Sequence, residues 1–145
     1  MSAARALSER IKALALEQGF ARIGIARAEP LSEDGARLTA WLAEGYHGQM
    51  SYLQQNVEVR SDPTHTGMLP SARSVIVLAT MYAQSASLSG AAPGRIARYA
   101  QGRDYHGLLY DRTRPLRRLL REAGANVRAC VDTLPVLERA WAMRA

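Results

Sequence analysis

The stretch SVIVLATMY, residues 74–82, decides the fold class of this chain. Val, Ile, Val and Leu follow one another there without a charge, as is typical of a strand covered on both faces. Further upstream, FARIGIA (residues 20–26) alternates Ile23 and Ile25 with smaller or polar residues, which predicts a second strand. Two strands this far apart leave room for a helix between them, and the flanking sequence supplies helical patterns.

Helical spacing of apolar residues marks the segments around these strands. Residues 7–15 repeat Leu, Ile and Ala at helical intervals, and Gly19 stands where a left-handed residue ends a helix. Ser32 is a suitable N-cap for a second helix, which Gly45 closes. Both predicted helices lie next to a predicted strand.

The second half of the chain continues the alternation of predicted helices and strands. Residues 60–72 and 83–94 are rich in small and turn-forming residues and are predicted loops. A helix follows from about residue 105, and Pro115 inside it restarts or kinks it. GANVRACVDT (residues 124–133) predicts a turn and a strand, and PVLERAWAMRA (residues 135–145) a helix with Pro in its first turn. Helices thus alternate with three strands, which predicts a single α/β domain over residues 1–145.

Composition narrows the class of protein. The formal net charge of the 145 residues is +6, and Lys12 is the only lysine, so arginine supplies the excess. Arginine favours a phosphate or carboxylate partner, although a coding preference for arginine would give the same composition. The sequence has neither a long apolar run nor a signal peptide. Cys130 is the only cysteine, which excludes an internal disulfide and favours the cytoplasm.

Asp132 is the first candidate for chemistry. It ends the predicted third strand just before a helix, the edge where ligands bind in open α/β sheets. A carboxyl group there can deliver or accept a proton. The alternative is that Asp132 only caps the helix that follows it.

Asp104, Tyr105 and His106 form a second cluster. His106 can exchange protons near neutral pH, and Tyr105 can stack on a flat ligand. Alternatively, Asp104 is a helix N-cap and the other two are ordinary first-turn residues. Arg60 and Arg73 flank the loop at 60–72 and would either bind an anion or remain solvated. No metal-ligand spacing, dinucleotide fingerprint, P-loop or nucleophile elbow occurs.

Five motifs occur together in one order. They are GYHGQMSYL (residues 45–53), RSDP (60–63), LPSARSVIVLATMY (69–82), GRIARYAQGRDYH (94–106) and VDTLPVLERAWAMRA (131–145). In this order and spacing they resemble the N-terminal half of the epoxyqueuosine reductases. That family reduces epoxyqueuosine to queuosine at the wobble position of tRNA, using cobalamin and two [4Fe-4S] clusters. The resemblance implies a mixed sheet flanked by helices, as in the flavin-reductase or nitroreductase-like corrinoid-processing proteins.

The resemblance also implies roles for residues. Asp132, in VDT, is the expected proton donor, and Arg139, in LER, is expected near the substrate. The residues expected to line the corrin are Arg60, Ala97 (through its backbone), Arg98, Tyr105 and His106. An acid above the corrin would supply protons without bulk water. Arginines 112, 117, 118 and 121 would attract the tRNA backbone or form a solvated helix face.

The sequence departs from the family pattern in two ways. Leu134 stands where the family usually has a small residue, so the backbone beside Asp132 is expected to be more crowded. One cysteine cannot ligate a [4Fe-4S] cluster, which usually takes about four thiolates. We therefore expect a truncated enzyme, one part of a split enzyme, or a stand-alone domain that lacks the ferredoxin-like C-terminal half. The alternative functions are a non-enzymatic corrinoid carrier and a basic RNA-binding module.

Overall fold

A computed structural model describes residues 2–82, 97–100 and 102–145 of the chain. Its elements, in order, are α1 (Ala3–Glu17), β1 (Arg22–Arg27), α2 (Ser32–Ala43), the 3-10 helix η1 (Ser51–Gln54), α3 (Val57–Ser61), β2 (Ser74–Ala79), the 3-10 helix η2 (Arg98–Ala100), α4 (Tyr105–Arg112), α5 (Arg114–Glu122) and α6 (Glu138–Arg144). The loop predicted at residues 83–94 lies outside the described residues.

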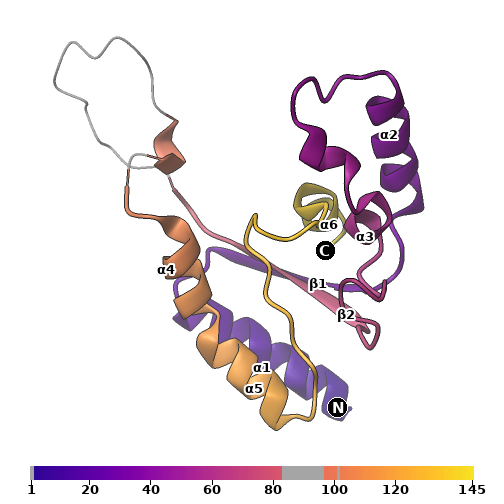
Figure 1. Cartoon of the computed structure of the whole chain (residues 1–145). Helices are drawn as coiled ribbons and strands as arrows, with labels where there is room; N and C mark the ends of the chain where they lie inside the picture. The colour runs from indigo at the N-terminus through magenta and orange to yellow at the C-terminus, as the bar shows by residue number, and fades with distance from the viewer. Residues whose placement is uncertain (1, 83–96, 101) are drawn as a thin grey trace, which may run out of the picture.

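The strands predicted at residues 20–26 and 74–82 are both confirmed, although β2 already ends at Ala79. β1 and β2 pair antiparallel, with Ile23 opposite Leu78 and Ile25 opposite Ile76. Directly opposed residues of an antiparallel pair share one face, so these four side chains form one apolar surface of the sheet. The connection between the strands carries α2, η1 and α3 (Figure 1).

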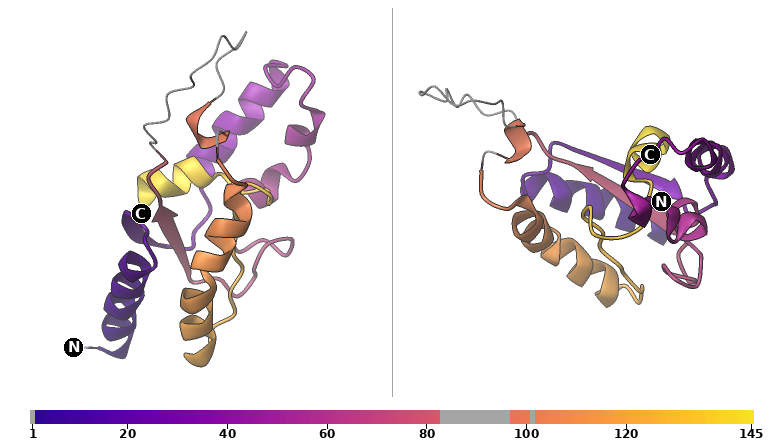
Figure 2. Two further views of the ribbon diagram at one scale, coloured as in Figure 1. Left: turned by 90° about the vertical axis from the view of Figure 1, so that its left-hand side faces the viewer. Right: turned by 45° about the horizontal axis from the view of Figure 1, so that its top comes forward.

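Helices cover both faces of this small sheet. α1 and α5 pack on the apolar face, where Ile11, Ala15, Phe20 and Leu116 form the buried core against Ile23 and its neighbours. α6 lies across the other face (Figures 1 and 2). A side chain at Gly24 would come within 2.7 Å of Ala145, so α6 approaches the strand where it has no side chain.

Helix ends follow the sequence signals only in part. Gly19 has a φ of +83° and ends the first helix as predicted. Ser32 is already the first residue of α2, and Leu31 occupies the N-cap without a side-chain hydrogen bond, so the predicted Ser32 cap is wrong. Pro115 does not kink a continuous helix. α4 ends at Arg112 and α5 restarts with the proline in its first turn, where its missing N–H costs nothing.

The third strand predicted at residues 124–133 is wrong. These residues form an irregular segment that side chains hold in place, since Arg128 donates to the carbonyls of Gly67 and Met68 at 3.0 and 2.7 Å. An apolar run bounded by turn residues does not distinguish a strand from a segment fixed in this way. The predicted last helix also begins later than Pro135, at Glu138. Along the described ranges, no helix is both long and apolar enough to cross a membrane.

Candidate functional site

Asp132 and Tyr105, far apart in the sequence, meet in the structure. The Tyr105 hydroxyl donates a hydrogen bond to the Asp132 carboxylate. Tyr105 is the first residue of α4, and Asp132 lies in the irregular segment before α6. The two regions that sequence reasoning selected separately therefore form one site, which we call the Asp132 site.

Aromatic rings form one wall of the Asp132 site. His106 stacks on Tyr105 with ring centroids 4.3 Å apart and an interplanar angle of 22°. Tyr99, from η2, meets Tyr105 edge-on at 6.1 Å and remains 55% exposed. The result is a partly exposed aromatic surface beside a carboxylate, and such a surface suits a flat ligand.

Asp104 has the local role that the simpler alternative predicted. Its carboxylate caps α4 by accepting the His106 backbone N–H at 3.0 Å, and it lies 2.7 Å from His106 Nδ1. The hydrogen bond from the backbone N–H, more than the imidazole, keeps the pKa of Asp104 below its usual value. Because the carboxylate holds Nδ1–H, the Nε2 atom of His106 is the nitrogen available to a ligand or proton.

Asp132 does not cap α6, which corrects the capping alternative. The helix starts six residues later, with Leu137 at its N-cap. Asp132 instead has a φ of +51°, in the left-handed region that side chains rarely adopt. Its backbone N–H donates to Glu138 Oε1 at 2.9 Å. Burial raises the pKa of Glu138, the hydrogen bond from the Asp132 N–H opposes this, and the Asp132 charge adds to the increase.

Proton release from Tyr105 provides a test of the Asp132 site by pH titration. Donation to the Asp132 carboxylate raises the pKa of Tyr105 from 10.0 to about 12. The neutral phenol is therefore favoured in the folded chain, and its stabilising contribution is complete below pH 10.0 and is lost as the pH rises through about 12. In Asp132→Asn we expect the pKa of Tyr105 to return towards 10.0, because the carboxylate charge is gone. NMR of tyrosine labelled with ¹³C at Cζ measures this, and an unchanged Tyr105 signal would contradict the hydrogen bond.

Arg60 lies next to the Asp132 site through its backbone. Its carbonyl accepts the Leu137 N–H at 3.0 Å, one residue before Glu138. Its guanidinium donates to the carbonyls of Tyr52 and Gln55 at 3.2 and 3.3 Å. The side chain thus ties α3 to the end of η1 and retains further N–H donors for an anion.

The other candidate residues surround this arrangement. Ala97 is exposed, and Arg98 begins η2, the short helix that carries Tyr99. Arg139 is exposed on α6 next to Glu138, and Leu134 is partly buried in the loop between Asp132 and the helix. Sequence reasoning missed Tyr99 and Glu138. Tyr99 lies in a quoted motif, whereas no local pattern indicates that Glu138 reaches back six residues.

Two arginines of α5 pair with acids close to them in the sequence. Arg114 pairs with Asp111, and Arg118 pairs with Glu122 at 2.8 Å. Arg117 is only 8% exposed, and its guanidinium lies over the Tyr110 ring at 3.9 Å. These arginines therefore contribute less to an anion-binding surface than their number predicts.

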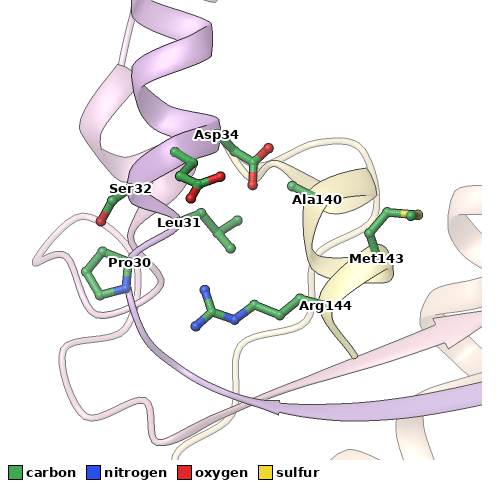
Figure 3. A pocket seen from close by; sticks show the side chains of 8 residues that line it. Pro30, Leu31, Ser32, Asp34, Ala140, Met143 and Arg144 are labelled. Carbon is green, nitrogen blue, oxygen red and sulfur yellow. The ribbon is translucent and has the colours of Figure 1, made fainter.

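A cavity of about 410 Å³ lies apart from the Asp132 site, between the start of α2 and α6 (Figure 3). Arg144 points into it and pairs with Glu29 at 3.1 Å. Glu33 and Asp34 line the same space, so its charge is mixed. No group of three or more His, Cys, Asp or Glu side chains that could hold a metal ion occurs in the part of the chain that the structure describes.

The described residues combine helices with a two-stranded sheet, and the acidic and aromatic groups of the Asp132 site come from two segments far apart in the sequence. Residues 60–133, half of the chain, match the family model described as Epoxyqueuosine reductase QueG, DUF1730. The chain belongs to this family, which confirms the resemblance of its motifs. Arg60 and Asp132 lie close to the two limits of the matched region.

Curated relatives agree with the family model. The chain is 37% identical over 143 residues to an epoxyqueuosine reductase of Leadbetterella byssophila, covering 97% of this chain and 46% of the relative. It is 40% identical over 142 residues to that of Gloeobacter violaceus, covering 92% and 41%, and 36% identical over 146 residues to that of Escherichia coli, covering 96% and 38%. The chain thus spans less than half the length of these relatives. No solved structure matches it.

Proposed function

We propose that this chain is the cobalamin-binding part of an epoxyqueuosine reductase, acting in the cytoplasm on tRNA that carries epoxyqueuosine. The observation that carries the proposal is the contact between Tyr105 and Asp132 within a member of this family. It joins the proposed proton donor to an aromatic surface next to it.

The described residues fit a flat, polar-rimmed macrocycle. The rings of Tyr99, Tyr105 and His106 offer apolar faces, and the exposed Asp132 carboxylate stands at their edge. Arg60 and the backbone of Ala97 would provide hydrogen bonds to the amide groups at the rim of the corrin. The resemblance of the motifs is what supports a fold like that of the flavin-reductase or nitroreductase-like corrinoid proteins; the described residues contribute a two-stranded antiparallel sheet with helices on both faces.

The same residues do not fit an iron-sulfur cluster. Cys130 is the only cysteine of the sequence, and burial raises the pKa of its thiol, which disfavours the thiolate that ligates iron. We therefore propose that electrons reach this chain from a partner, either a ferredoxin-like half or a separate protein.

Bound cobalamin would supply reducing electrons to the epoxide. The chain's own task is to deliver protons to the oxygen that leaves carbon. Asp132 would hold the proton at its carboxyl group, and the Tyr105 hydroxyl would fix the orientation of that group. Arg139, exposed on the neighbouring helix, would contact the phosphate or ribose of the tRNA.

Cobalamin binding tests this proposal directly. Hydroxocobalamin added to the purified chain should show a shifted corrin absorption spectrum that saturates at one equivalent. Salt-sensitive binding of tRNA without any corrin binding would select the basic RNA-binding module instead. No spectral change at protein concentrations of about 100 μM, a weak-affinity regime, would reject the cobalamin proposal.

A further inference from the structure

Glu138 is the half-buried acidic group at the start of α6 that the proposed proton transfer does not use. Its Oε1 atom accepts the Asp132 N–H at 2.9 Å across a span of six residues. Tyr105 holds the other end of the same residue by its carboxylate. Asp132 is therefore fixed at both its backbone and its side chain.

The backbone of Asp132 needs such support. A φ of +51° lies in the left-handed region, which few residues with a side chain adopt, although Asp does so more often than most. The hydrogen bond to Glu138 is a contact that favours this conformation, because it holds the Asp132 N–H on Oε1. We expect loss of the bond to free the Asp132 carboxylate from Tyr105.

The start of α6 also contacts α3 at Arg60. The Leu137 N–H donates to the Arg60 carbonyl at 3.0 Å, and the next residue along the chain is Glu138. The start of α6 thus contacts both the Arg60 backbone and the expected proton donor.

We propose that Glu138 is a positioning residue, which holds the left-handed backbone of Asp132 through its N–H and so directs the Asp132 carboxylate to Tyr105. Glu138 itself need not touch substrate or cofactor. What Asp132 then does rests on the proposed function, whereas the positioning is a property of this chain alone. The raised pKa of Glu138 agrees with a carboxyl group buried against the loop that it holds.

Two conservative variants distinguish the effect of the length of the Glu138 side chain from the effect of its charge. Glu138→Gln keeps the length and a carbonyl oxygen that accepts the Asp132 N–H. Glu138→Asp keeps the charge and the preference for a helix start, but is one methylene too short. Hydrogen exchange of the Asp132 amide, measured by NMR on the whole ¹⁵N-labelled chain, reports the bond itself. We expect Glu138→Gln to retain the protection and Glu138→Asp to lose it by about tenfold or more.

The ionisation of Tyr105 gives a second readout. Glu138→Asp should lower the pKa of Tyr105 from about 12 towards 10.0, and Glu138→Gln should leave it high. Glu122→Ala, which removes an exposed acid paired with Arg118, should change neither readout. Unchanged Asp132 protection in Glu138→Asp would overturn the proposal, as would equal loss in both variants. A chain that passes these tests but binds no cobalamin would overturn the proposed function and leave the positioning intact.

Discussion

Asp132→Asn is expected to lower the rate of epoxide reduction by about a hundredfold or more, the range that a positioned proton donor contributes. Asn is close in shape to Asp and tolerates the left-handed backbone conformation seen at this position. Its Oδ1 atom can still accept the Tyr105 hydroxyl, so the site keeps its geometry. The variant loses the transferable proton and the negative charge of the carboxylate.

The measurement supplies the chain with cobalamin, a low-potential chemical reductant and tRNA that carries epoxyqueuosine. Queuosine formation is followed by mass spectrometry of the digested tRNA. Asp111→Asn is the matched control, because Asp111 is an exposed acid of α4 that pairs with Arg114. Cobalamin binding should remain equal in all three proteins. Equal rates for wild type and Asp132→Asn would show that Asp132 is not the donor, which is the result expected of a corrinoid carrier.

The elements that were predicted correctly are those whose structure is determined by residues next to them in the sequence. The run at residues 74–82 and the alternation of Ile23 and Ile25 depend only on period and composition, and both strands formed. Gly19 likewise ends its helix because few other residues accept its backbone conformation. In each case, the signal and the structure occupy the same few residues.

The predictions that were wrong concern residues whose structure depends on contacts from elsewhere in the chain. VRACV has the composition of a strand, but Arg128 ties its segment to carbonyls about sixty residues away. Asp132 is a residue type that often caps helices, but here its N–H donates to Glu138 and its carboxylate accepts from Tyr105. A pattern confined to one segment carries no information on such partners. This is why the candidate residues could be selected from the sequence whereas their arrangement could not.

The aromatic wall leads to the second large effect. Tyr105→Ala is expected to weaken cobalamin binding by about tenfold or more, equivalent to roughly 1.4 kcal/mol, since it removes a ring that would be covered by the corrin. Tyr105→Phe keeps the ring and loses only the hydroxyl, so its affinity should stay within about twofold of wild type. Spectroscopic titration with hydroxocobalamin measures both.

A control must remove exposed apolar surface elsewhere. Leu16 is 56% exposed on α1, away from the Asp132 site, and Leu16→Ala should bind cobalamin as wild type does. If Tyr105→Ala also binds normally, the corrin does not lie on this wall. If Tyr105→Phe binds cobalamin as weakly as Tyr105→Ala does, the hydroxyl and its hydrogen bond to Asp132 contribute more to binding than the ring. The two tyrosine variants thus distinguish a surface that stacks on the cofactor from one that only orients the acid.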